Sequence, residues 1–113
     1  MALQAVLEAV ADPHRRRILE LVRAEELAAG VIAEHFEISR PAVSQHLRVL
    51  KAAGLVSDRR TGTFRYYRAR PEGLNELRGY LDEFWSESLS RLKSSVEAEE
   101  RRRRTEGSPR GRA

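Results

Sequence analysis

Residues 39–50, which read S-R-P-A-V-S-Q-H-L-R-V-L, restrict the fold of this chain more than any other segment. On a helix, the spacing of four and three residues between Val43, Leu47 and Leu50 places these apolar side chains on one face. Polar and basic residues occupy the rest of the surface. The segment therefore predicts an amphipathic helix with one face buried and the other exposed.

The exposed face of this helix has the chemistry that reads nucleic acid, and a helix has the width that fits a major groove. Its candidate DNA contacts are Ser39, Arg40, Pro41, Ser44, Gln45, His46 and Arg48. Gln45 suits a bidentate contact to adenine, whereas Arg40 and Arg48 each suit either guanine or phosphate. For His46 two interpretations stay open, a contact in the groove and a hydrogen bond within the fold.

Charge is distributed unevenly along the 113 residues, whose net charge is +4. Residues 39–70 contain eight Lys and Arg against Asp58 alone, a net charge of +7. Residues 1–38 and 71–100 carry −3 and −5, and residues 101–113 carry +5. Because the first basic segment includes the amphipathic helix, the distribution indicates a nucleic-acid surface there.

Composition excludes several classes of protein. The chain has no cysteine, so it has neither disulfides nor thiolate metal ligands. Its N-terminal apolar stretch, residues 3–10, is interrupted by Gln4 and Glu8 and is too short for a signal segment or a membrane span. We therefore expect a cytoplasmic protein of one domain, without membrane insertion.

Short-range signals predict four helices, at residues 3–10, 13–23, 29–36 and 40–53. Asp12 and Ser39 are typical N-caps, and Pro13 and Pro41 lie in first turns, where proline is tolerated. Gly54 is a typical helix stop. The third and fourth helices, joined by a short turn, form a predicted helix-turn-helix unit.

A β-hairpin is predicted after the fourth helix. Residues 55–60 and 63–69 are rich in Val, Thr, Phe and Tyr and flank Thr61 and Gly62. A two-stranded ribbon in this position has the shape of a wing that reaches phosphates or a minor groove. The candidate DNA contacts of the wing are Arg59, Arg60, Thr63 and Arg65.

Pro71 opens the last predicted helix, which has apolar residues at spacings of three, four and seven. A helix of about twenty residues spans roughly 30 Å, so its apolar stripe extends past its own core. A second copy of the chain is the simplest cover. The candidate dimer contacts are Leu3, Val6, Leu74, Leu77, Leu81, Phe84 and Trp85. A small-molecule pocket lined by Phe84 and Trp85 is the alternative.

The predicted domain comprises residues 1–93, and residues 94–113 are expected to form a basic, disordered tail because they cannot bury enough apolar surface. The run of four arginines at residues 101–104 is either a solvated helix end or a basic arm that adds affinity for phosphates.

These elements together predict a mostly α-helical winged helix-turn-helix fold with a small β-hairpin. Three stretches resemble the ArsR/SmtB family of bacterial winged-helix repressors: A-D-P-H-R-R-R-I-L-E-L at residues 11–21, I-A-E-H-F-E-I-S-R-P-A-V-S-Q-H-L-R-V-L-K-A-A-G-L-V at residues 32–56 and D-R-R-T-G-T-F-R-Y-Y-R at residues 58–68. The resemblance implies a homodimer that binds an imperfect inverted repeat in a promoter, blocks transcription and is released by a signal.

Many members of this family sense metals, and here the sequence departs from the pattern. The thiolate site would need cysteines where this chain has Ala28 and Gly30, and the closing helix has no histidine for the other site. The chain therefore resembles the branch without metal ligands, which includes small autorepressors. We expect neither metal nor cofactor, and an inducing signal from a protein or a small molecule.

The primary hypothesis is a dimeric repressor that binds double-stranded DNA in a sequence-specific manner. A protein-interaction module without specific DNA binding is the alternative. An enzyme is the weakest hypothesis, and no catalytic residue is predicted, because Ser44 and His46 are two residues apart on a helix and point in different directions.

Overall fold

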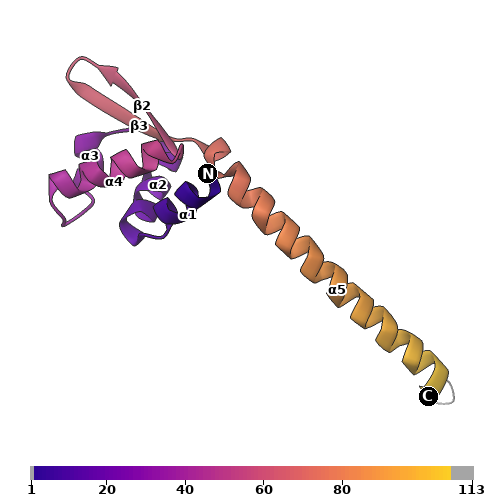
Figure 1. Ribbon diagram of the computed structural model, residues 1–113. Helices are drawn as coiled ribbons and strands as arrows, with labels where there is room; N and C mark the ends of the chain where they lie inside the picture. Colours follow the sequence, from indigo (N-terminus) through magenta and orange to yellow (C-terminus); the bar gives the residue numbers. More distant parts are fainter. Residues whose placement is uncertain (1, 108–113) are drawn as a thin grey trace. The chain divides into compact units, whose positions relative to one another are not determined.

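The structure is a computed structural model that describes residues 2–107, and the chain forms two compact units, Met1–Arg78 and Gly79–Ala113. The first unit contains four helices, a three-stranded sheet and a short 3-10 helix, followed by the start of the last helix (Figure 1). Among residues 2–107, no helix is long and apolar enough to cross a bilayer. The mostly helical fold with a β-hairpin confirms the predicted fold class.

The first two helices, α1 (Ala2–Val10) and α2 (Pro13–Ala24), are joined by a polar corner. Asp12 caps α2, and its Oδ1 accepts hydrogen bonds from the backbone N–H groups of His14 and Arg15 at 2.7 and 3.2 Å. Arg15 and Arg16 donate to three of the last carbonyls of α1, so the corner satisfies the exposed ends of both helices.

The third helix, α3 (Ala29–Ala33), begins where it is predicted and is shorter at its C-terminal end. Before it, β1 (Leu27–Ala28) pairs with a distant strand, which the local sequence does not signal. After it, the backbone N–H groups of His35 and Phe36 bond to the carbonyls three residues earlier. The predicted helix end at Phe36 is therefore wrong, because the last turn tightens into 3-10 geometry.

The fourth helix, α4 (Arg40–Ala52), begins as predicted and ends one residue earlier, with Ala53 as its C-cap. The hydroxyl of Ser39 accepts a hydrogen bond from the N–H of Ala42, and Gly54 follows the C-cap with a φ of 79°. Val43, Leu47 and Leu50 are at most 2% exposed. They join Ile18, Ile32 and other apolar residues in one core, so the buried face of α4 is the predicted one.

The wing consists of β2 (Val56–Thr61) and β3 (Phe64–Ala69), in a sheet with the order β1-β3-β2. Thr61 pairs with Phe64, so Gly62 and Thr63 form the turn, one residue later than predicted. Gly62 has a φ of 64°, a conformation that glycine adopts readily. The position of this glycine determines the register of the hairpin.

Pro71 opens a 3-10 helix, η1 (Pro71–Leu74), instead of the last α-helix, and α5 (Asn75–Gly107) follows it. The expected disorder from residue 94 is wrong as far as Gly107, because α5 continues through that segment. Helix-favouring Ala, Glu and Arg fill it, and Glu99 forms ion pairs with Arg102 and Arg103 one turn later. Residues 108–113 of the predicted tail lie outside the described residues.

Candidate nucleic-acid interface

The polar face of α4 is uncovered in the first unit. Arg40, Ser44, Gln45 and Arg48 are exposed. Among residues 2–107, no hydrogen bond or ion pair occupies the side chains of Ser44, Gln45 and Arg48. Because the opposite face is in the core, these groups project outward from a rigid support. The amide and guanidinium groups are available for base edges or phosphates.

Ser39, Pro41 and His46 differ from the other predicted contacts of this helix. The Ser39 side chain caps α4, and Pro41 is exposed in the first turn. His46 is half-buried, and its Nδ1 lies 3.2 Å from Nη1 of Arg15. Of the two interpretations left open for His46, this geometry corresponds to the contact within the fold.

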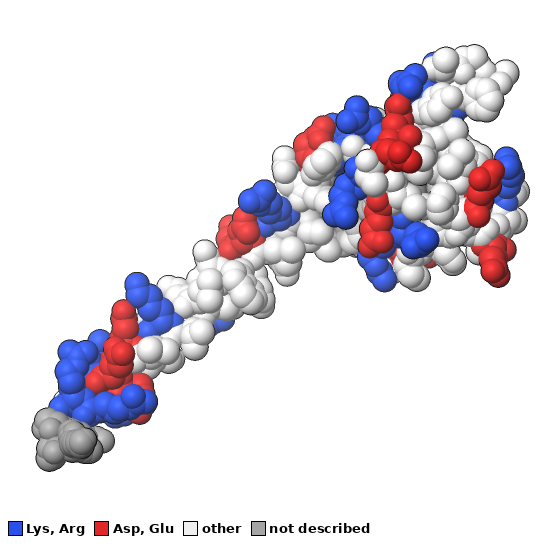
Figure 2. All heavy atoms as spheres, turned by 180° about the vertical axis from the view of Figure 1, so that it is seen from behind, with Lys and Arg blue, Asp and Glu red and all other residues white. Residues whose placement is uncertain are grey.

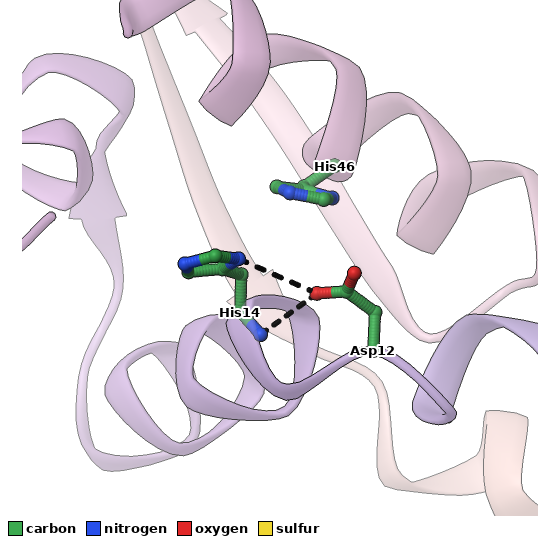
Figure 3. Close-up of side chains that lie close together, drawn as sticks. All are labelled: Asp12, His14 and His46. Carbon is green, nitrogen blue, oxygen red and sulfur yellow. Dashed lines mark hydrogen bonds and ion pairs between the residues drawn. The ribbon is translucent and has the colours of Figure 1, made fainter. Parts of the chain in front are cut away.

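Figure 3 shows the surroundings of His46. Its ring stacks on that of His14 with a centroid distance of 5.5 Å, and Asp12 lies beside both rings. Partial burial acts to raise the pKa of Asp12. The N–H groups of Arg15 and His14 and the positive charge nearby outweigh it, so the pKa lies below its ordinary value. Asp12 is therefore a carboxylate at neutral pH.

On the wing, Arg59 already has partners. Its Nε and Nη2 each donate to the carboxylate of Glu26 at 2.9 Å, and its Nη1 donates to the hydroxyl of Thr61 at 2.8 Å. The guanidinium also lies 4.8 Å from the ring centroid of Tyr66. The hydrogen bond from Arg59 lowers the pKa of Glu26. Arg59 thus ties the wing to the segment before β1.

Asp58 links the wing to α4. Its carboxylate lies 2.9 Å from Nζ of Lys51, at the end of α4, and 3.3 Å from Nε of Arg65 on β3. The hydrogen bond from Lys51 lowers the pKa of Asp58, partial burial opposes it, and the charges of Lys51 and Arg65 add to the lowering. The ion pairs thus connect the two elements that are candidates for contact with DNA.

Arg60 and Thr63 are exposed at the far end of the wing, and Arg65 is half-buried by its contact with Asp58. Positive charge in the first unit is thus divided between paired and unpaired groups. On the face seen in Figure 2, basic and acidic side chains alternate over this unit. Of the predicted DNA contacts, the uncovered basic groups are Arg40 and Arg48 on α4 and Arg60 on the wing.

The predicted dimer contacts are of two kinds. Val6 is 1% exposed and belongs to the core of the chain itself, so it has no surface to offer a partner. Leu3 and Leu77 are half-buried. The others are open: Leu74 is 37% exposed, Leu81 50%, Phe84 58% and Trp85 64%.

Glu26 and Asp58 hold candidate contacts of the wing in ion pairs, and neither is predicted from the sequence as a site residue. Glu26 is 33 residues from Arg59, and no local pattern connects the two. Asp58 does leave a signal, because it is the single acidic residue among eight basic ones in residues 39–70. A lone carboxylate in a basic segment is expected to have a specific cationic partner.

Comparisons with known proteins agree with this geometry. Residues 12–58, from the cap of α2 into the wing, match the model of the family described as bacterial regulatory protein, arsR family. The chain is 47% identical over 92 residues to the HTH-type transcriptional regulator Rv2034 of Mycobacterium tuberculosis. That match covers 81% of this chain and 86% of the relative.

Two further proteins extend the comparison. The transcriptional repressor SdpR of Bacillus subtilis is 52% identical over 62 residues, which cover 55% of this chain and 69% of SdpR. A solution structure of a homodimeric winged helix-turn-helix DNA-binding domain from Mycobacterium bovis is 32% identical, with a TM-score of 0.61. It covers 80% of this chain and 83% of that domain.

Proposed function

Because the chain belongs to the ArsR family of bacterial regulatory proteins, we propose that it is a dimeric repressor that binds an inverted-repeat operator in double-stranded DNA. Its relatives are transcription regulators and repressors, and its structural neighbours include a winged helix-turn-helix DNA-binding domain. The chain is thus a DNA-binding regulator rather than the protein-interaction module considered as the alternative. Transcription regulators of this kind are not enzymes.

The uncovered polar face of α4 is the observation on which the proposal depends. Arg40, Ser44, Gln45 and Arg48 form the groove-reading set, with Ser39 and Pro41 at the entry of the helix. Arg60 and Thr63 are the free contacts of the wing. Arg59 and Arg65 would reach DNA only from within their present ion pairs, which supports a role for both in positioning the wing.

Dimerisation follows from the exposed apolar residues of α5 and from the homodimeric neighbour. In such a dimer each α4 enters one major groove, with half-sites about one helical turn, roughly 34–36 Å, apart. Residues 1–93 supply DNA binding and dimerisation in this proposal. The dimer acts in the cytoplasm, where bacterial DNA lies.

Release of the repressor is assigned to a protein or a small molecule. The positions of the family's thiolate site hold Ala28 and Gly30, and residues 75–107 of α5 contain no histidine. A signal that acts through those two metal sites therefore has no ligands in this chain.

Gel-shift titration against the DNA upstream of the chain's own coding sequence tests the proposal. We expect a discrete complex on this DNA, no comparable complex on a scrambled sequence, and an affinity that falls steeply with salt because bound phosphates release counterions. Equal affinity for the scrambled DNA, or an affinity that does not depend on salt, would contradict specific repression.

A further inference from the structure

Three side chains of metal-ligating type meet between the α1–α2 corner and the middle of α4. They are Asp12, His14 and His46, and one donor atom from each lies within 4.8 Å of the other two (Figure 3). All three residues are half-buried. We propose that Asp12, His14 and His46 bind one divalent transition-metal ion of the zinc type, which links the start of α2 to α4.

The donor set favours this class of ion. Two imidazole nitrogens and one carboxylate oxygen are ligands of borderline softness that suit Zn²⁺, Co²⁺ and Ni²⁺, whereas Mg²⁺ and Ca²⁺ prefer oxygen alone. The site differs in place from both metal sites that the family resemblance implies, since its residues come from α2, its N-cap and α4.

Two of the three donor groups present lone pairs in the folded chain. Arg15 can only donate, so in its 3.2 Å contact with His46 the Nδ1 atom is the acceptor. Asp12 is a carboxylate, and its Oδ2 accepts no hydrogen bond from residues 2–107. This carboxylate oxygen is therefore open to an ion.

A modest rearrangement closes the site. Donors around one tetrahedral ion with bonds of about 2.0–2.2 Å lie roughly 3.3 Å apart, so each donor moves inward by about 1 Å. The ring of His46 must turn out of its stack on His14, and its Nδ1 must leave Arg15. Arg15 stays in place without that contact, because it still donates to the carbonyls of Ala9 and Glu8.

The surroundings support a site that is protected on one side. The ring of Phe36 stands edge-on to that of His14 at a centroid distance of 5.7 Å and packs against one side of it. Three protein ligands leave a fourth position for water on the exposed side. An ion in this place fixes His46 inside the fold and stabilises the contact between α2 and α4.

Titration of the untagged full-length protein with Co²⁺ tests the proposal directly. We expect one equivalent of Co²⁺ to produce the visible absorption of a tetrahedral site, and Zn²⁺ to abolish it by displacement. Thermal unfolding should show a higher Tm in the presence of Zn²⁺, because the ion binds the folded state.

The variants His14→Ala and His46→Ala should each bind Co²⁺ at least about tenfold more weakly. Loss of a residue that only hydrogen-bonds to a metal ligand already lowers metal affinity by about 10- to 100-fold, and these two residues are themselves the ligands. Asp12→Asn removes the charge but keeps an N-cap residue, so it tests the ligand without removing the cap of α2. His35→Ala is the matched control. His35 lies in the turn after α3 and bonds to the carbonyl of Val31, outside the cluster.

Each result decides the proposal, provided that far-UV circular dichroism shows the variants to be folded. Loss of the Co²⁺ spectrum and of the Zn²⁺-dependent rise in Tm in the cluster variants, with both kept in His35→Ala, would support it. Absence of both effects in the wild type, or their persistence in all three cluster variants, would overturn it. None of these measurements depends on DNA, so the proposed repressor function succeeds or fails separately.

Discussion

Gln45 and Arg59 show how two residues with the same predicted role differ once the chain is folded. The amide of Gln45 lies on the uncovered face of α4. The guanidinium of Arg59 is held by Glu26 and Tyr66, and any contact with DNA would compete with them. A side chain reads bases only where the fold leaves its donors and acceptors unpaired, so Gln45 is the better candidate for base recognition.

Substitution of Gln45 tests base recognition at the level of one side chain. Gln45→Ala should cost about 1–3 kcal/mol of binding free energy at one operator base pair and relax the preference there. Arg60→Ala should weaken binding to all sequences by similar amounts, because a phosphate contact carries no base information. Binding to a set of operators with single base-pair changes measures both. Equal losses on cognate and random DNA for Gln45→Ala would remove this residue from the reading set.

Asp58 provides a prediction about pH. Its pKa is lowered in the folded state, so its contribution to stability is complete above the pKa of the unfolded chain and is lost as the pH falls through the folded value. Asp58→Asn should lower the free energy of unfolding at neutral pH by about 1 kcal/mol, a small figure because Lys51 is 54% exposed. Urea unfolding of both proteins should give a difference that shrinks below about pH 4. A difference that stays constant into acid would contradict the role of the ion pairs.

At the scale of elements, close backbone contact determines how the chain leaves the wing. Gly73 in η1 lies against Gly54, the residue after α4, and a Cβ on Gly73 would collide with the carbonyl group of Gly54. Arg70 donates to the same carbonyl at 2.9 Å. The sequence predicts an α-helix that begins at Pro71. It does not predict η1, because the contact between Gly54 and Gly73 joins residues that are far apart in sequence.

The two glycines near the start of α5 form a matched pair for testing this contact. Gly73→Ala should destabilise the fold by about 1–3 kcal/mol, because the backbone must shift to admit a methyl group. Gly79→Ala, within α5, has no atom within 4 Å of the added Cβ and should stabilise by about 0.5–1 kcal/mol through helix propensity. Thermal or urea unfolding measures both changes. Equal effects of the two substitutions would show that the contact with Gly54 is unimportant.

At the scale of the whole molecule, none of residues 79–105 in the second unit is buried. Leu81, Phe84, Trp85, Leu89 and Leu92 are between 48% and 64% exposed. On the face seen in Figure 2, charged side chains are densest toward the end of α5, and white, uncharged surface is more extensive before them. An apolar stripe on a single helix gains stability only when another surface covers it, which is why the dimer is part of the proposed function.

A charge on this stripe should weaken the dimer. Leu81→Glu removes about 1.5–3 kcal/mol of apolar burial per subunit and adds two charges to a symmetric interface. Ser90→Glu places the same charge on the opposite side of α5, where no effect is expected. Sedimentation equilibrium gives the dimer fraction, and the fluorescence of Trp85 should shift to the red when the dimer dissociates. Dimers of unchanged stability in Leu81→Glu would exclude this face as the interface.

The sequence by itself determined the helices with clear caps, the buried face of α4 and the presence of the hairpin. These features depend on residues within a few positions of one another, such as Asp12 beside His14 or Val43 beside Leu47. Only the tertiary structure decided that β1 joins the sheet, that Val6 is a core residue and that Glu26 occupies Arg59. The same is true of the meeting of His46 with Asp12 and His14. Each of these outcomes depends on a contact between residues distant along the chain, and the local pattern carries no information about such contacts.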